Sequence, residues 1–213
     1  MSSANPFNIE GYKIISYEII RDVGFPHVVI TPMGSGTLAL GIWKGFKELF
    51  QMNLIPELPH LVGVQSEQVN PIERAYKHGD TKIKAVIPGK TIATGVPVDN
   101  PGIAGAVALR AIKETKGFII SVSEERILNA FKLLPREEGI FAEPTGALSV
   151  AGLKFALEKE LISRGKKVVC IISASGFKDL NAFKKLGRSK TQIRSIPPDI
   201  KLVEKILKVW SSR

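Results

Sequence analysis

The sequence predicts an α/β fold, in which a parallel twisted sheet carries helices on both faces. Short apolar runs alternate along the chain with longer segments in which apolar residues recur every three or four positions. The last run, Lys167–Ile172, is continuously apolar after its first residue, which is typical of a parallel strand covered on both faces. Because no internal repeat or low-complexity linker interrupts the alternation, we expect a single domain over residues 1–213.

The first part of the chain is predicted to contain three helices and two strands. Ile15, Ile19 and Val23 recur at helical spacing, which predicts a helix over 9–24 closed by Gly24. The segments that follow are a strand over 27–31, a helix over 36–54, a strand over 61–65 and a helix over 71–78, in which Pro71 suits the first turn.

The rest of the chain continues the alternation after a loop over 79–101 that is rich in glycine and proline. Ser123 is predicted to cap a helix that begins with Glu124 and Glu125, because acidic residues favour a first turn. The other predicted elements are a helix over 102–115, a strand over 118–121, a helix over 144–161, the strand over 167–172 and a last helix marked by Leu202, Ile206 and Val209.

The composition is that of a globular protein, with 44% hydrophobic and 23% charged residues. No apolar run approaches the ~18 residues of a membrane span, and the first residues lack the pattern of a secretory signal. The single cysteine, Cys170, excludes an internal disulfide and a multi-cysteine metal site. We therefore expect no membrane partner, no metal and a cytoplasmic location.

The net charge of +10 allows two interpretations. One is nucleic-acid binding through the densest basic run, Lys178–Arg194. The other is a solvated, lysine-rich surface, and it is favoured because that run contains one aromatic residue, Phe183, and no nucleic-acid motif.

Two turns of small residues each follow a predicted strand. The first is Gly34-Ser35-Gly36-Thr37-Leu38, and the second is Ser173-Ala174-Ser175-Gly176. The carboxyl ends of parallel strands meet in one crevice, and a helix that starts with small residues presents free N–H groups and a positive dipole end to a phosphate. The first turn is neither a Walker loop nor a dinucleotide fingerprint. Together the turns favour a phosphorylated cofactor or substrate.

Six stretches carry a family resemblance. They cover residues 5–11, 32–49 (PMGSGTLALGIWKGFKEL), 62–72 (VGVQSEQVNPI), 91–98 (TIATGVPV), 122–153 and 168–179 (VVCIISASGFKD). Their order and spacing resemble the C-terminal part of threonine synthases, within the fold-type II pyridoxal-phosphate family that includes cysteine synthase and threonine dehydratase. The resemblance implies the large-domain portion of the tryptophan synthase beta-like fold and pyridoxal 5′-phosphate as cofactor.

Site residues follow from this resemblance. Backbone N–H groups of the glycine-rich turn would hold the cofactor phosphate, which implies Gly34, Ser35, Gly36, Thr37 and Leu38. Thr37 stands where the family commonly has glycine. The hydroxyl partner of the pyridine nitrogen falls on Ser173, a neutral group that would not keep the nitrogen protonated as a carboxylate would. Ser175 stands where threonine synthases frequently have histidine, so it is assigned no catalytic role.

A lysine is the residue that this interpretation lacks. Similar enzymes hold the cofactor as a Schiff base with a lysine of an S-x-K type motif, and nothing in residues 1–30 resembles that motif. Lys178 aligns with a late G-x-K-D segment of the family and is not assigned this role. No catalytic residue is therefore assigned, and the chain alone need not retain the cofactor.

The resemblance implies that the whole enzyme converts O-phosphohomoserine, a phosphorylated amino acid, to threonine and phosphate by γ-elimination and β-addition of water. This chain would be a C-terminal half or a truncated form, with exposed apolar surface, in a homodimer or beside a partner that supplies the N-terminal half. The alternative is a non-catalytic module that retains the phosphate cup as a regulator or storage subunit.

Other candidate residues have plain structural interpretations. The histidines, His27, His60 and His78, are too far apart in sequence to indicate a ligand pair and are expected at the surface or at strand ends. Cys170 is expected in the core, and Trp43 is expected to pack. Glu137 and Glu138 are expected to be solvated at a helix end, whereas Glu143 precedes Pro144 at a helix start, where the dipole favours a carboxylate.

Overall fold

The computed structural model describes residues 5–185 and 197–211. The chain divides into two compact units, Met1–Lys178 and Asp179–Arg213. The sequence predicted one domain over residues 1–213, and the whole of the sheet lies in the first of these units. The second unit contains the helices α7 (Leu180–Lys185) and α8 (Ile200–Ser211), of which α7 was not predicted.

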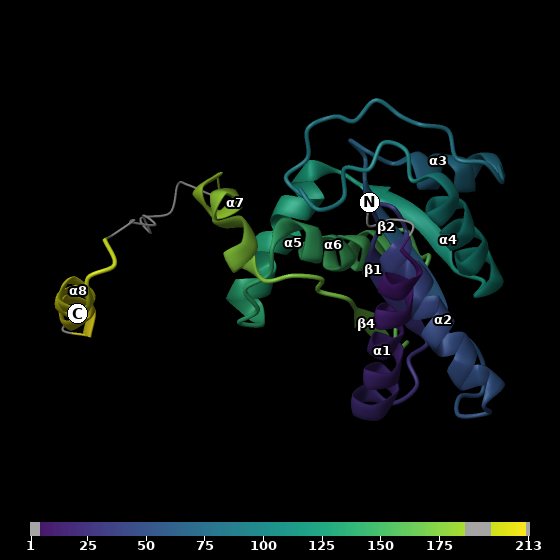
Figure 1. The fold of residues 1–213 in the computed structure, drawn as a ribbon, viewed down its shortest axis with the longest axis horizontal. Helices are drawn as coiled ribbons and strands as arrows, with labels where there is room; N and C mark the ends of the chain where they lie inside the picture. The colour runs from purple at the N-terminus through teal and green to yellow at the C-terminus, as the bar shows by residue number, and fades with distance from the viewer. Residues whose placement is uncertain (1–4, 186–196, 212–213) are drawn as a thin grey trace. The chain divides into compact units, whose positions relative to one another are not determined.

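The sheet has four parallel strands in the order β3-β2-β1-β4 (Figure 1). The strands are β1 (Val28–Pro32), β2 (His60–Ser66), β3 (Phe118–Val122) and β4 (Val168–Cys170). The strand predicted over 167–172 is shorter than expected, and its residues are half-buried rather than covered on both faces. In the described part of the chain it lies at the edge of the sheet and pairs with β1 alone, so a continuous apolar run here does not mark a central strand.

Helices cover both faces of the sheet, as predicted. On one face the buried side chains of Val29, Leu61 and Ile119 share a core with α2, α3 and α4, and α1 packs on α2. On the other face α6 packs against the strands and α5 packs on α6 (Figure 1). The approach of α6 is close, because a Cβ added at Gly152 would overlap a methyl group of Val64. The helices of this unit are α1 (Pro6–Val23), α2 (Thr37–Gln51), α3 (Pro71–His78), α4 (Gly102–Glu114), α5 (Glu124–Glu137) and α6 (Pro144–Glu158).

Local signals explain where several helices begin and end. The helix α1 starts three residues before the prediction, because Pro6 occupies the first turn and the side chain of Asn5 accepts a hydrogen bond from the N–H of Phe7 at 3.0 Å. It ends at Gly24, whose φ is 75°. Ser123 caps α5 as predicted, by accepting from the N–H of Arg126. No helix or strand occurs in 79–101, which confirms the predicted loop.

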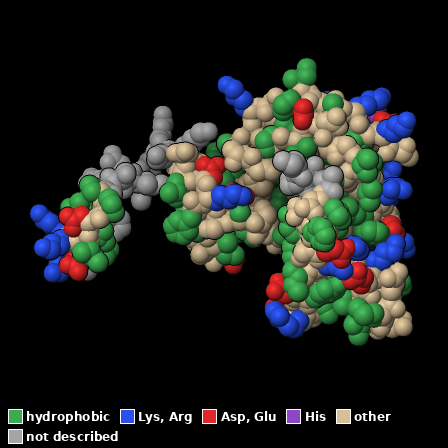
Figure 2. Space-filling view, viewed as in Figure 1, with side chains coloured by type: hydrophobic (Ala, Val, Ile, Leu, Met, Phe, Trp, Pro, Cys, Tyr) green, Lys and Arg blue, Asp and Glu red, His purple; other side chains and the backbone are tan. Residues whose placement is uncertain are grey.

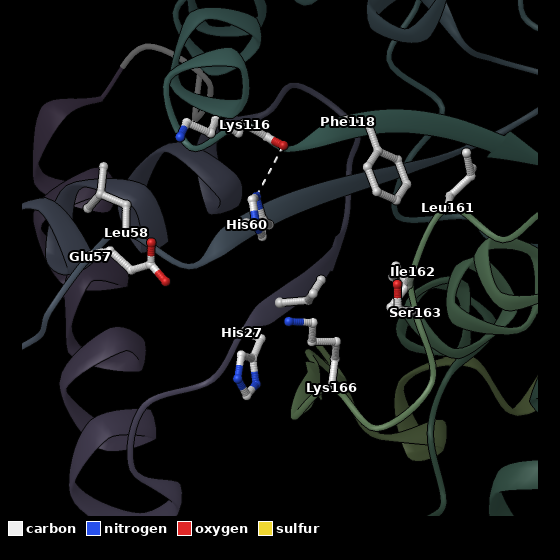
Figure 3. A pocket seen from close by; sticks show the side chains of 11 residues that line it. His27, Glu57, Leu58, His60, Lys116, Phe118, Leu161, Ile162, Ser163 and Lys166 are labelled. Atoms are coloured by element: carbon white, nitrogen blue, oxygen red, sulfur yellow. Dashed lines mark hydrogen bonds between the residues drawn. The ribbon is translucent and has the colours of Figure 1, made fainter.

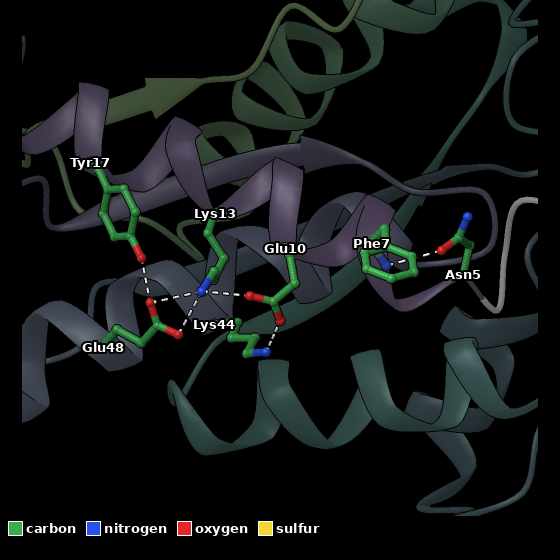
Figure 4. Close-up of polar contacts among 7 residues, drawn as sticks. All are labelled: Asn5, Phe7, Glu10, Lys13, Tyr17, Lys44 and Glu48. Carbon is green, nitrogen blue, oxygen red and sulfur yellow. Dashed lines mark hydrogen bonds and ion pairs between the residues drawn. The ribbon is translucent and has the colours of Figure 1, made fainter.

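Ion pairs join α1 to α2 at a group of residues that we call the seam cluster: Glu10, Lys13, Tyr17, Lys44 and Glu48 (Figure 4). The Lys13 ammonium donates to both oxygens of Glu48, at 2.8 and 3.0 Å, and lies 2.6 Å from Glu10. Tyr17 donates its hydroxyl proton to Glu48, and Lys44 pairs with Glu10. The hydrogen bond from Lys13, and then that from Tyr17, holds the pKa of Glu48 below its ordinary value.

The second unit is described by itself. In α8 the large apolar side chains of Ile200 and Leu207 are exposed, at 75% and 60%. The side chain of Asp199 accepts a hydrogen bond from the N–H of Lys201 at 2.9 Å and so caps the helix start. Among the described residues of both units, we find no helix with the length and apolar content to cross a membrane.

Candidate functional site

A cavity of about 400 Å³ lies at the carboxyl-terminal edge of the sheet, and we call it the cup cavity. It collects residues that follow β1 and residues that follow β4, which are neighbouring parallel strands. The six site residues predicted from the sequence all line it, namely Gly34, Ser35, Gly36, Thr37, Leu38 and Ser173. The structure therefore brings the two small-residue turns together. The cavity volume is within the range of about 300–1,000 Å³ that is usual for small-molecule sites.

The turn before α2 forms one wall of the cup cavity and depends on glycine. Gly36 is the N-cap of α2 with φ 90°, a left-handed conformation that side chains rarely adopt. A Cβ at Gly36 would lie 2.6 Å from the Cβ of Ala108, so α4 also leaves no room for one. No side chain in the described chain caps this helix. The N–H groups of its first turn lack intrahelical partners, and together with the helix dipole they give a geometry that can bind an anion.

Hydroxyl groups add polarity to this wall. The Ser35 and Thr37 hydroxyls lie 2.7 Å apart in a hydrogen bond. Thr37 thus contributes a side-chain hydroxyl to the lining of the cavity. Since one proton of the pair is used in this bond, an anion bound by the first turn of α2 would have one hydroxyl donor beside it as well as backbone N–H groups.

The turn after β4 forms another part of the lining, and backbone hydrogen bonds hold it. The N–H of Gly176 donates to the carbonyl of Phe141 at 2.8 Å, and the N–H of Glu143 donates to the carbonyl of Ala174 at 3.1 Å. The segment that precedes α6 therefore pairs with the turn that contains Ser173. Ser173 itself is exposed, so its hydroxyl is accessible to a ligand.

Three polar residues that sequence analysis did not assign to the site also line the cup cavity: Glu143, Thr145 and Lys178. Glu143 is 4% exposed and is the N-cap of α6, which confirms its predicted place at a helix start. The hydroxyl of Thr145 accepts a hydrogen bond from the N–H of Gly95 at 2.9 Å, which ties the long loop to α6. The longest family match contains Glu143 and Thr145, but only the fold shows that they face the turn at Gly34.

Other predictions for single residues are also answered by the structure. His27 precedes β1, His60 begins β2 and His78 ends α3, which confirms their placement at the surface or at element ends. Trp43 packs against the core. Cys170 is half-buried, and burial raises the pKa of its thiol to about 12, so it is not a thiolate at neutral pH.

Two predictions concern features outside this cavity. Of the basic run Lys178–Arg194, residues 186–194 lie outside the described residues, so the structure does not test nucleic-acid binding there. Within the described ranges 5–185 and 197–211, no group of three or more His, Cys, Asp or Glu residues could hold a metal ion.

Comparison with known proteins connects this geometry to a family. The model of a family described as pyridoxal-phosphate dependent enzyme matches residues 1–174. The chain is 38% identical over 213 residues to a threonine synthase of Methanocaldococcus jannaschii, covering 98% of this chain and 51% of that protein. It is 33% identical over 208 residues to a threonine synthase of Mycobacterium tuberculosis, covering 97% of this chain and 54% of that protein. The chain spans about half the length of these curated relatives.

Solved structures show the same fold. A threonine deaminase from T.th. superposes with a TM-score of 0.65 at 27% identity, covering 81% of this chain and 58% of that chain. A fungal L-serine ammonia-lyase from Rhizomucor miehei superposes with a TM-score of 0.69 at 18% identity, covering 85% and 57% of the two chains, which shows the fold alone. The predicted fold class is confirmed, and with the family match over residues 1–174 the chain belongs to the family of pyridoxal-phosphate dependent enzymes of fold-type II.

Proposed function

We propose that this chain supplies the cofactor-phosphate and ring-nitrogen side of a threonine synthase-type site, which converts O-phosphohomoserine and water to threonine and phosphate. The observation that carries the proposal is the cup cavity, where an uncapped helix start and Ser173 line one space. The 38% identity to a threonine synthase supports the choice of reaction within the family.

The residues present fit pyridoxal phosphate. The left-handed Gly36 and its contact with Ala108 leave a cradle that a Cβ would fill, and no side chain of the described residues caps the N–H groups of Thr37 and Leu38. These groups would hold the phosphate, with the hydroxyls of Ser35 and Thr37 beside it. When bound, this cofactor supplies an electron sink that stabilises a carbanion of the substrate.

Ser173 would accept or donate one hydrogen bond at the ring nitrogen. A hydroxyl is neutral, so it orients the ring without fixing a proton on that nitrogen. Glu143 is buried, and its backbone N–H donates to Ala174, which keeps the turn that contains Ser173 in place. Lys178 is exposed at the lining, where its ammonium would add positive charge for anionic substrates.

We further propose that the anchoring lysine comes from another polypeptide segment, which a hetero-partner would supply. The chain spans about half the length of its curated relatives, which leaves room in those proteins for such a segment. The helix α1 exposes apolar side chains that a partner could cover. Phe7 is 81% exposed and Ile14 is 53% exposed, and Figure 2 shows hydrophobic side chains among charged ones over α1.

Cofactor titration tests the cup. We expect saturable quenching of protein fluorescence by pyridoxal phosphate, weakened roughly tenfold or more by Ser35→Ala with Thr37→Gly, since each tenfold step corresponds to about 1.4 kcal/mol of lost hydrogen bonding. The matched control is Ser163→Ala, an exposed serine outside the cup cavity. Equal binding by both variants and by the unmodified chain would contradict the site assignment.

Borohydride reduction followed by mass spectrometry tests the origin of the lysine. We expect no covalent cofactor adduct on the chain alone. When the chain is mixed with a lysine-bearing segment and the mixture turns over O-phosphohomoserine, we expect the adduct on that segment. An adduct on the chain alone that Lys178→Met abolishes would overturn the proposal and assign the anchoring role to Lys178.

A second candidate function is binding of the cofactor in the same cavity without catalysis. If every assembled form binds the cofactor and none releases phosphate from O-phosphohomoserine, the chain is a non-catalytic binding module. The single cysteine supports a cytoplasmic location for either function.

A further inference from the structure

A second cavity lies at the amino-terminal edge of the sheet, at the opposite ends of the strands from the cup cavity. Its volume is about 240 Å³, and we call it the histidine cavity (Figure 3). His27 and Val28 stand at the start of β1, His60 begins β2 and Phe118 begins β3. The cavity lies within the first unit, and the function proposed above uses none of its residues.

The two imidazoles that line this cavity have opposite hydrogen-bonding character. His27 Nδ1 accepts a hydrogen bond from the N–H of Lys167 at 3.0 Å, so its Nε2 carries the proton and is a donor. His60 Nδ1 lies 2.9 Å from the carbonyl oxygen of Thr115, which requires an Nδ1 proton. In its neutral form His60 therefore has an acceptor at Nε2. One ring is suited to an anion and the other to a cation.

The charged groups of the lining likewise include both signs. The exposed Lys116 and Lys166 carry ammonium groups, and the exposed Glu57 carries a carboxylate. Figure 3 shows the Lys166 ammonium near His27 and the Glu57 carboxylate on the other side of the view, so a ligand with one charge alone would meet a group of like sign. A zwitterion satisfies both signs at once.

The remaining wall is apolar. Phe118 is half-buried, Ile162 is 5% exposed and Leu161 is 50% exposed. Figure 3 shows Phe118, Leu161 and Ile162 on one side of the view and Glu57 on the other, with His60 between them. The cavity is smaller than the range of about 300–1,000 Å³ typical of drug-sized ligands, so its ligand must be small.

From these observations we propose that the histidine cavity binds a small α-amino acid with an aliphatic side chain. The carboxylate lies toward Lys166 and His27 Nε2–H, the ammonium toward Glu57 and His60 Nε2, and the side chain toward Phe118. This site is separate from the cup cavity and does not depend on the cofactor.

The test is a titration with L-leucine, followed by the NMR signals of the three histidine Cε1–H groups. His78, at the end of α3, does not line the cavity and is an internal control. We expect saturable shifts of the His27 and His60 signals with a half-saturation of about 1 mM, equivalent to roughly 4 kcal/mol of binding, while the His78 signal stays in place. We also expect at least fivefold weaker binding of 4-methylpentanoate, which lacks the amine, and of 3-methylbutylamine, which lacks the carboxylate.

Two variants of exposed residues identify the charge contacts without disturbing the core. Glu57→Gln should weaken leucine and the amine roughly three- to fivefold and leave 4-methylpentanoate unchanged, within the range of about 0.2–1 kcal/mol for exposed ion pairs. Lys166→Met should weaken leucine and 4-methylpentanoate, and Lys132→Met, an exposed lysine on α5, should change neither. The proposal is overturned if leucine leaves the His27 and His60 signals unmoved, or if a one-charge analogue binds as tightly as leucine.

Discussion

The helix α2 is built differently at its start and along its side. At its start, the cup depends on backbone groups, on glycine at residue 36 and on hydroxyls, and no charged side chain lies in that turn. Along its side, the seam cluster holds α1 with carboxylates and ammonium groups. The start of α2 should therefore respond to changes of shape, whereas its side should respond to pH.

The largest effect is expected for Gly36→Ala. The left-handed φ costs a non-glycine residue about 1–2 kcal/mol, and the new Cβ would lie 2.6 Å from that of Ala108, which adds about 1–3 kcal/mol of overpacking. We expect a large loss of unfolding free energy and of pyridoxal phosphate binding, measured by denaturant titration and fluorescence.

Gly79→Ala is the matched control for that change. Gly79 has φ 74°, close to that of Gly36, but a Cβ there meets nothing within 4 Å. It should lose only the backbone contribution, about 1–2 kcal/mol, and should keep cofactor binding. Equal losses in the two variants would mean that the contact with α4 is unimportant and that the start of α2 is not shaped by packing.

An intermediate effect is expected for Thr145→Val. The change removes the acceptor of the Gly95 N–H, and the loss of this part-buried hydrogen bond costs about 0.5–1.5 kcal/mol. Amide hydrogen exchange in residues 91–98 should quicken, and cofactor affinity should fall because this loop lines the cup cavity.

The control for the loop is Thr91→Val, because the Thr91 hydroxyl accepts from the N–H of Ala93, two residues away. It should leave exchange at Gly95 unchanged. If Thr145→Val also leaves it unchanged, the loop does not depend on the bond to α6.

The smallest effect is expected at the seam cluster and depends on pH. The pKa of Glu48 is lowered in the folded state, first by Lys13 and then by Tyr17, and the pKa of Glu10 is lowered by Lys13 and Lys44. A carboxyl whose folded pKa is lowered stabilises the protein above its unfolded pKa of about 4.3, and this stabilisation is lost as pH falls through the folded pKa. In Glu48→Gln the unfolding free energy should therefore fall less steeply than in the unmodified chain as the pH drops below about 5.

Glu18→Gln is the control for this change, because Glu18 is exposed on the same helix as Lys13. The unfolding free energy of this variant should fall with decreasing pH as steeply as that of the unmodified chain. The contrast between the two parts of α2 is wrong if Gly36→Ala changes the pH dependence of the unfolding free energy below about pH 5 as much as Glu48→Gln does.

Much of the fold was predictable because its signals are local. Pro71 and Gly79 bracket α3 at the predicted positions, and Ser123 caps α5. The edge position of β4 was not predictable, because an apolar run reports burial without reporting how many strands lie beside it. The helix α7 was missed because its six residues are too few to show a period.

The candidate site also has a part that could be predicted from the sequence and a part that could not. The turn at Gly34–Leu38 could be identified from composition and from family resemblance, because glycine and small residues before an amphipathic helix have a local meaning. Lys178 and Thr145 could not be assigned to that site, and His27 and His60 were interpreted as unrelated. Their proximity depends on which strands are neighbours.

The chain's residue order alone specifies where most helices and strands form and that α2 begins after a glycine-rich turn, since capping, glycine conformation and apolar period act over a few residues. Only the folded sheet decides which turns share a cavity. In the order β3-β2-β1-β4, β1 lies between partners whose residues are about 30 and 140 positions away along the chain, so both edges of the sheet combine groups that no local pattern connects.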